Sequence, residues 1–272
     1  MSRQVRFQKK GWRDRFHKLH SPCFEAEFCS QTLFVTRVGL LANHLQDNQT
    51  PLTKSYKSRL RSLIMGRIDK IYCQRAIGHE RITLNQADLI NTVNNEFKTE
   101  LVGWGIPEEK IVVFPCGISL RRRLLFDAVS SEIPREPQVV FVGSFDNRKG
   151  ATDLPKIFGN IYSALPQAKF KLLGTGAGRD ERYVLPNFLK RLRSRIEVIP
   201  SFSSDDLPGL LSACAIGVFP SYADGFGFGV LEMLAASIPV IAYAVAGPAT
   251  MLPAEYLVYP GDFAGLSLKV VE

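Results

Sequence analysis

The sequence predicts an α/β protein with parallel β-sheets. The first observation is residues 213–246, where an apolar run at Ile216–Phe219 precedes a glycine-containing loop, a helical pattern and a second apolar run at Val240–Val245. This succession of strand, helix and strand is the βαβ unit of a parallel sheet. The second observation is a similar succession over residues 89–114, with a helix predicted at Asn94–Trp104 between two apolar runs. Two such units, far apart in the chain, predict two α/β domains.

A polar segment separates the two units. Residues 119–137 carry the arginine run Arg121–Arg123 and two prolines and show no sustained periodicity, which is typical of a linker. We therefore expect an N-terminal domain over residues 1–118 and a C-terminal domain over residues 138–272.

The other elements follow from apolar runs and helical periodicity. The strands at Leu89–Val93 and Ile111–Phe114 are expected to be buried. Further strands are expected at Thr32–Val38, Gln138–Val142, Lys169–Leu173, Ile196–Ile199 and Met251–Tyr259, and further helices at Lys54–Arg75, Thr152–Ala164 and Asp205–Ala213.

The loop within residues 213–246 has the composition of a ligand site. Gly225, Gly227 and Gly229 alternate along it, so the backbone can adopt positive φ and approach a ligand closely. The loop leads into a helix start, where unpaired amides and the helix dipole favour an anion. Asp224 precedes the glycines and Glu232 is expected in the first helical turn. We infer that the amides bind phosphates while the two acids bind hydroxyl groups of a sugar or ribose. The simpler alternative is an ordinary βα loop with a capping acid.

The spacing of Asp224, seven residues and Glu232, with GFG after the first acid and LE at the second, resembles the E-x7-E motif of retaining glycosyltransferases of family four. The resemblance implies that Asp224 contacts the donor sugar, that Glu232 contacts the ribose, and that the intervening amides contact the diphosphate. The first acid is aspartate here, where the family has glutamate. The donor-binding residues that the motif implies also include Gly225, Phe226, Gly227 and Leu231.

A second motif follows the strand at Gln138–Val142. The sequence GSFDNRKG begins at Gly143 and ends in adjacent Arg148 and Lys149 before a glycine. Arginine offers a planar fork to a diphosphate and lysine a point charge. The segment resembles the G-R-L-x-x-x-K-G motif of the same family, with Ser144 in place of its early arginine and Arg148 as the substitute. An exposed turn with two solvated cations is the alternative.

Weaker matches extend the resemblance to about residues 80–265. The string from Ala87 to Ser119 resembles the last βαβ unit of the family's N-terminal domain, and Gly174 stands in a glycine turn that faces the donor cleft in the family. Phe202 is a candidate for stacking on the nucleotide base. The family's N-terminal histidine is not identified, because His44 follows the run LFVTRVGLLAN in surroundings that differ from the family pattern. The family's returning C-terminal helices are not found either, so we expect a chain shortened at both ends or a reduced member.

Composition indicates which classes of binding partner the protein favours. The net charge is +8 and the pI is about 9.3, which favours nucleotide sugars, acidic lipid surfaces or nucleic acid. Five scattered cysteines without a C-x-x-C pair indicate reduced thiols and not a disulfide framework or a zinc site. The four histidines show no metal-binding spacing. No apolar run reaches the roughly 18–20 residues of a membrane span, and the N-terminus lacks a signal-peptide core. Residues 1–22 mix basic and aromatic side chains, which suits either a membrane surface or a solvated segment.

Together these features imply the B-type glycosyltransferase fold, two Rossmann-like domains facing a cleft, with an incomplete N-terminal domain. We expect transfer of a sugar from a nucleotide-diphosphate-sugar donor to a glycan or lipid-linked acceptor, with retention, as in the synthesis of cell-envelope polysaccharides. The catalytic residues would be Asp224, Lys149 and Arg148, with no metal or other cofactor. A cytoplasmic location is expected, with peripheral contact at the membrane's inner face. The alternatives are a truncated, non-catalytic nucleotide-sugar-binding protein and, on charge alone, a nucleic-acid-binding protein, which we do not expect.

Overall fold

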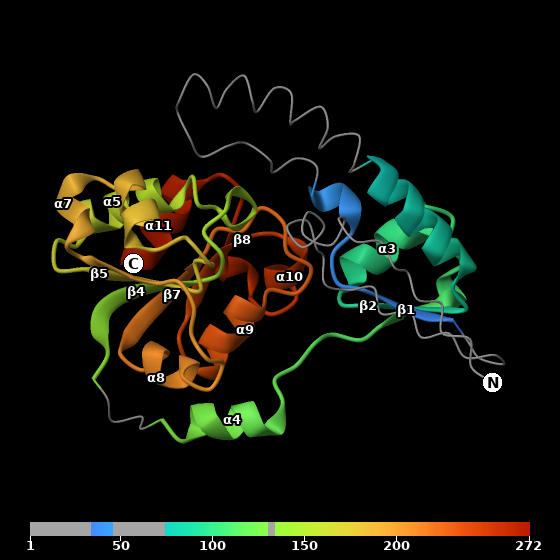
Figure 1. The fold of residues 1–272 in the computed structure, drawn as a ribbon, viewed down its shortest axis with the longest axis horizontal. Helices are drawn as coiled ribbons and strands as arrows, with labels where there is room; N and C mark the ends of the chain where they lie inside the picture. Colours follow the sequence, from blue (N-terminus) through green and yellow to red (C-terminus); the bar gives the residue numbers. More distant parts are fainter. Residues whose placement is uncertain (1–33, 46–73, 130–133) are drawn as a thin grey trace.

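The computed structural model describes residues 34–45, 74–129 and 134–272. The basic segment 1–22 and nearly all of the helix expected at Lys54–Arg75 lie outside these ranges. The described chain forms two units, each around a parallel sheet (Figure 1). We call residues 34–45 and 74–117 the N-terminal unit and residues 134–272 the C-terminal unit.

The larger sheet belongs to the C-terminal unit and has the strand order β6-β5-β4-β7-β8-β9, with all neighbours parallel. The chain first builds outward from β4 in one direction and then from β7 in the other. Ligands in open parallel sheets bind beyond the carboxyl ends of the strands at such a switch point. The strands are β4 (Glu136–Val142), β5 (Lys169–Leu173), β6 (Ile196–Ile199), β7 (Cys214–Phe219), β8 (Val240–Tyr243) and β9 (Leu257–Val258).

Helices cover both faces of this sheet (Figure 1). Alternate residues of β4 show why, because Val139 and Phe141 enter one buried cluster while Val140 and Val142 enter another. The first cluster contains side chains of α5 (Leu154–Ala164), α7 (Lys190–Arg193) and α11 (Phe263–Val271), and the second those of α8 (Leu207–Leu211) and α9 (Phe228–Ala235). The unit also contains two short helices and three 3-10 turns. They are α6 (Glu181–Val184), α10 (Ala246–Ala249), η3 (Asn147–Lys149), η4 (Leu185–Asn187) and η5 (Ala254–Tyr256).

The N-terminal unit has a described sheet of three parallel strands in the order β1-β2-β3. They are β1 (Val35–Val38), β2 (Leu89–Thr92) and β3 (Ile111–Val113), joined by η1 (Ala42–Leu45), a helix over 74–86, α3 (Asn95–Gly103) and η2 (Glu108–Lys110). The buried cluster of this unit also contains Phe226 and Ala246 from the C-terminal unit. The two units therefore share part of one hydrophobic core.

The segment expected to be a linker without periodicity contains a helix, α4 (Leu120–Asp127). Ser119 begins it, because the Ser119 hydroxyl accepts a hydrogen bond from the Arg122 amide at 3.4 Å. Phe126 is buried in the core of the C-terminal unit, so this side chain anchors the helix there. The helix is not visible in the sequence because one buried aromatic residue in a basic segment creates no apolar stripe.

Two further predictions need correction. The strand at Ile111–Phe114 is not buried throughout, since Val112 is 42% exposed and Phe114 69% exposed at the edge of the described sheet. The strand expected at Met251–Tyr259 is reduced to the two residues of β9, because Pro253 precedes the 3-10 turn η5 in the middle of that range. Helix α11 beyond it was not predicted.

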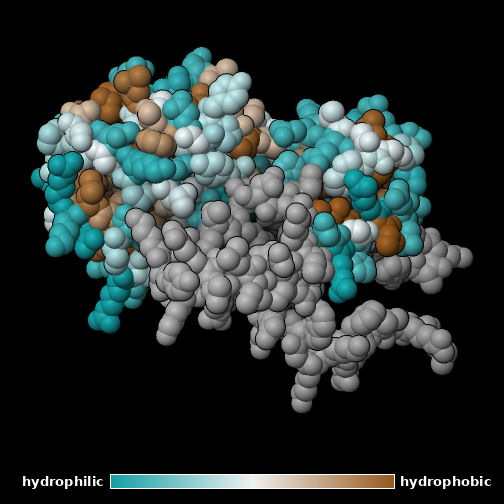
Figure 2. Space-filling view, turned by 90° about the horizontal axis from the view of Figure 1, so that it is seen from above, coloured by the Kyte–Doolittle hydropathy of each residue, from teal (hydrophilic) through white to brown (hydrophobic). Residues whose placement is uncertain are grey.

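The described surface carries hydrophobic residues singly or in small groups among hydrophilic ones on the face that Figure 2 shows. No helix within the described ranges has both the length and the apolar composition that crossing a bilayer requires.

Candidate active site

The two motif loops meet at the switch point of the larger sheet. The loop after β4 ends in η3, and the loop after β7 runs from Pro220 to Gly227. The amide of Tyr222 donates to the carbonyl of Arg148 at 2.8 Å. Gly150 has φ +81°, and a Cβ there would lie 2.1 Å from the carbonyl oxygen of Pro220. Only glycine permits this contact, so Gly150 of the motif is required for the loops to touch.

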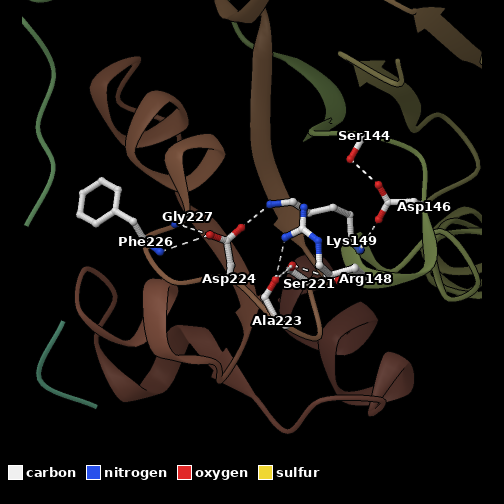
Figure 3. A network of polar contacts seen from close by, with 9 residues as sticks. All are labelled: Ser144, Asp146, Arg148, Lys149, Ser221, Ala223, Asp224, Phe226 and Gly227. Carbon is white, nitrogen blue, oxygen red and sulfur yellow. Dashed lines mark hydrogen bonds and ion pairs between the residues drawn. The ribbon is translucent and has the colours of Figure 1, made fainter. Parts of the chain in front are cut away.

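Lys149 and Asp224 form an ion pair across the two loops (Figure 3). Both side chains are mostly buried, at 15% and 13% exposure. The Lys149 ammonium also lies 4.9 Å from the ring centroid of Phe219, at the end of β7. Arg148 donates from Nη1 to the carbonyl of Ala223 at 3.0 Å. The structure thus brings the two predicted cations and the first predicted acid together.

Asp224 is ionised at neutral pH. Burial alone would raise its pKa, but the charge and hydrogen bond of Lys149, the charge of Arg148 and the amide of Gly227 together hold the pKa below its ordinary value. Asp224 Oδ1 accepts hydrogen bonds from the amides of Phe226 at 3.2 Å and Gly227 at 2.8 Å. Two of the amides expected to face a diphosphate therefore contact the aspartate in this structure.

Asp146 organises the loop after β4, although no prediction assigned it a role. Its Oδ2 accepts from the Ser144 hydroxyl at 2.6 Å, and its Oδ1 accepts from the Lys149 amide at 3.1 Å (Figure 3). Arg179 Nη1 lies 3.5 Å from Oδ2. Asp146 thus caps the turn that presents Arg148 and Lys149, and connects it to Ser144 after Gly143.

The positive φ expected for the alternating glycines occurs at one of them, and the other two allow close packing of the backbone. Only Gly227 of the three has a positive φ, of +83°. A Cβ on Gly225 would lie 1.7 Å from the carbonyl oxygen of Gly39 in the N-terminal unit, and one on Gly229 would lie 2.6 Å from the carbonyl oxygen of Val142. Gly225 therefore lets the two units touch, and Gly229 lets α9 approach β4.

A cavity of about 170 Å³ lies between the units, with walls from both. His44 enters it from η1, and its Nε2 lies 2.9 Å from Glu100 Oε2 on α3. His44 is not assigned from sequence because its surroundings differ from the family pattern, and its contact with Glu100, 56 residues away, leaves no local signal. The lining residues are Leu40, His44, Glu96, Phe97, Tyr222, Asp224, Ala244, Val245 and Ala246.

Asn94 connects the N-terminal unit to the site. Its Nδ2 donates to the carbonyl of Gly225 at 2.6 Å, and its Oδ1 caps α3 by accepting from the Phe97 amide at 2.7 Å. Phe226 is 6% exposed and its ring enters the N-terminal core. The loop that holds Asp224 is therefore fixed by both units.

Tyr222 connects the same loop to Asp153, because its hydroxyl donates to Asp153 Oδ2, which also accepts from the hydroxyl of Tyr243 on β8. Burial, with the hydrogen bond and charge of Asp153, raises the pKa of Tyr222 to about 12. Tyr222 therefore remains a hydrogen-bond donor at neutral pH.

Glu232 does not join the cluster around Lys149. It lies in the second turn of α9, one turn later than expected, and its Oε1 is 2.8 Å from Arg122 Nη2 on α4.

The remaining predicted site residues make other contacts. Leu231 packs against the N-terminal core. The ring of Phe202 lies 3.3 Å from the position that a Cβ on Gly174 would take, so these two residues are neighbours. Among the described residues, no group of three or more potential metal ligands occurs.

The described chain is thus an α/β protein with two parallel sheets, a cavity lined by residues of both units, and a lysine–aspartate pair at the switch point of the larger sheet. The family model described as "Glycosyl transferases group 1" matches residues 136–272. The chain belongs to this family.

Similar proteins agree with this assignment. The D-inositol 3-phosphate glycosyltransferase of Rhodococcus jostii is 25% identical over 184 residues, which cover 64% of this chain and 41% of that protein. The O-antigen chain mannosyltransferase B of Escherichia coli is 24% identical over 224 residues, covering 74% of this chain and 54% of that one. The chain thus spans about half the length of these curated relatives.

A solved structure supports the fold. Anabaena HepE, crystallised with UDP and glucose, superimposes with a TM-score of 0.61 at 16% identity, over 88% of this chain and 61% of HepE. The fold is the B-type glycosyltransferase fold, and the expected α/β class with two Rossmann-like units is confirmed.

Proposed function

We propose that this chain transfers a sugar from a nucleotide-diphosphate-sugar donor to a glycan or lipid-linked acceptor, with retention at the anomeric carbon. The observation that carries the proposal is the contact of Lys149 with Asp224 at the switch point, where Asp224 also lines the cavity between the units. A cation and a carboxylate in contact there suit a ligand that combines phosphates with hydroxyl groups. The retaining outcome is proposed from the motif resemblance.

Lys149 and Arg148 would stabilise the leaving nucleoside diphosphate. Negative charge grows on this group as the glycosidic bond breaks, and donors held in place before the reaction are the most effective. An ammonium carries three N–H donors, so Lys149 can contact a phosphate oxygen while it remains on Asp224. The start of α9 adds a partial positive charge of roughly +0.5. Because these groups supply positive charge, we expect no metal requirement.

Asp224 would orient the donor sugar in the cavity. Its ionised carboxylate is an acceptor for sugar hydroxyls, and Glu96 and His44 of the N-terminal unit offer further polar groups in the same cavity. Glu232 would contact the ribose. Gly143 and Ser144 would lie beside the phosphates, and Gly174 and Phe202 beside the base.

Family membership supports this reading. One relative is a D-inositol 3-phosphate glycosyltransferase, another is an O-antigen chain mannosyltransferase, and HepE was crystallised with UDP and glucose. We propose a donor of the same chemical class and an acceptor within a surface glycan.

The test is turnover by the full chain. UDP-glucose, UDP-N-acetylglucosamine and GDP-mannose are offered separately, and release of the nucleoside diphosphate is measured. Asp224→Asn should lower the rate at least about a hundredfold, because it removes a charged group next to the reacting sugar. Asp127→Asn is the matched control, since Asp127 is 60% exposed on α4 and should leave the rate unchanged. Tight nucleotide binding without turnover of any donor would favour the non-catalytic binding protein instead.

A further inference from the structure

Helix α4 is attached to the C-terminal unit by two adjacent arginines. Arg121 pairs with both carboxylate oxygens of Asp205, with Nη1 lying 3.0 Å from Oδ1. Arg122 pairs through Nη2 with Glu232 Oε1 at 2.8 Å. In Figure 1, α4 lies in green along the lower edge of that unit, near α8 and α9.

The two ion pairs differ in exposure. The side chains of Arg121 and Asp205 are 71% and 38% exposed, whereas those of Arg122 and Glu232 are 22% and 14% exposed. Phe126, one turn after Arg122 on the same face of α4, is buried in the core and fixes the orientation of the helix. The Arg122 pair is therefore held in a defined geometry.

Stability alone does not explain this buried pair. Arg122 Nε is buried with no hydrogen-bond partner among the described residues. A buried ion pair with an unsatisfied N–H is often less stabilising than apolar residues of the same volume. What the pair does provide is a fixed carboxylate, because a glutamate side chain otherwise samples several rotamers.

The geometry leaves one oxygen of Glu232 for a ligand. Arg122 contacts Oε1, and Oε2 makes no hydrogen bond to another described residue. A carboxylate oxygen can accept more than one hydrogen bond, and the two adjacent hydroxyls of a ribose are suitable donors. A 2′-deoxyribose lacks one of them.

We propose that Arg122 is a positioning residue, which fixes Glu232 so that the site prefers ribonucleoside diphosphates to 2′-deoxyribonucleoside diphosphates. This inference rests on the proposed function, because it takes Glu232 as the ribose contact. It assigns α4, the segment between the two sheets, a direct part in selecting the donor.

The experiment measures binding by calorimetry with UDP, GDP and ADP, and then compares the tightest of these with its 2′-deoxy counterpart. The full-length wild-type chain should prefer the ribonucleotide about tenfold, as expected for a hydrogen bond to a charged group. Arg122→Gln and Glu232→Gln should each reduce this ratio to about one to threefold. The double variant should show no further loss. It also leaves no unpaired buried charge, which keeps the test valid if a single variant folds poorly.

Arg121→Gln is the matched control, because it removes the ion pair of α4 with Asp205 and leaves Glu232 paired with Arg122. Its ribo-to-deoxy ratio should equal that of the wild type. A full tenfold preference in Arg122→Gln would overturn the inference, and so would an equal loss in Arg121→Gln, which would indicate general docking of α4. If the wild-type chain binds none of the three diphosphates, the proposed function fails and this inference fails with it.

Discussion

The two units contribute to the candidate site in different ways. The C-terminal unit brings Arg148, Lys149 and Asp224, whose charges meet at the ends of two neighbouring strands. The N-terminal unit brings His44 and Asn94, which line the cavity or contact the loop of Asp224. One unit therefore holds the charged chemistry, and the other encloses it and fixes its geometry.

This difference shows what kind of residue a local pattern can identify. Charged groups at the ends of adjacent parallel strands converge because the sheet topology requires it. Groups from a second unit converge only when two separate cores pack together, as Phe226 and Ala246 do in the N-terminal core. Three variants test whether the two units contribute to the site in these different ways.

The largest effect is expected for Lys149→Ala in the C-terminal unit. The variant removes the cation proposed for the diphosphate and leaves the buried Asp224 without its ion-pair partner. Nucleoside-diphosphate affinity should fall at least about a hundredfold, or roughly 3 kcal/mol. Calorimetry measures it, with Lys169→Ala as the control because Lys169 is 49% exposed and pairs with Glu136. If Lys149→Ala bound nucleoside diphosphate with wild-type affinity, Lys149 would not be a diphosphate contact.

The next effect concerns Glu80 in the N-terminal unit, which is 4% exposed and accepts from the Ala42 amide at 3.0 Å. Burial, reinforced by the charge of Glu100, raises its pKa from 4.5 to about 7, against the opposing effects of the Ala42 amide and His44. The folded state therefore holds this proton up to higher pH than the unfolded state does. Stability should be greatest below about pH 4.5 as far as Glu80 is concerned, and should fall by about 3 kcal/mol as the pH rises through 7.

Glu80→Gln should remove this loss, because the amide keeps an acceptor for Ala42 and has no charge. Urea unfolding at pH 5 and pH 8 measures the effect, and the exposed Glu96→Gln is the control. Identical pH profiles of the wild type and Glu80→Gln would show that Glu80 titrates normally.

The smallest of the three effects is expected for Asn94, which joins the units. Asn94→Ala should cost about 2 kcal/mol in unfolding free energy, because it removes a helix cap and leaves the Gly225 carbonyl without its side-chain donor. Asn94→Ser keeps a cap but not the contact with Gly225. It should therefore retain much of the stability and raise KM for the donor. If Asn94→Ser matched the wild type in KM, the contact between the units would not shape the site.

The motifs predicted the charged residues of the C-terminal candidate site, but not the contacts that hold those residues in place. Lys149 and Asp224 are assigned from strand-end patterns, and their contact follows from β4 and β7 being neighbours. The contact of Glu232 with Arg122 spans 110 residues and depends on how α4 docks. From sequence that segment is expected to be a linker, since nothing local in a run of arginines indicates a buried partner.

The sequence by itself determined the α/β class, most of the strands and the residues that carry charge at the switch point, because hydrophobic periodicity and glycine placement are local properties. Only the tertiary structure decided that Gly225 and Gly229 allow close packing, that His44 and Asp224 line one cavity, and that Arg122 pairs with Glu232. These depend on contacts between segments tens of residues or more apart in the chain. Such contacts form when separate cores close on each other, and no short stretch of sequence encodes them.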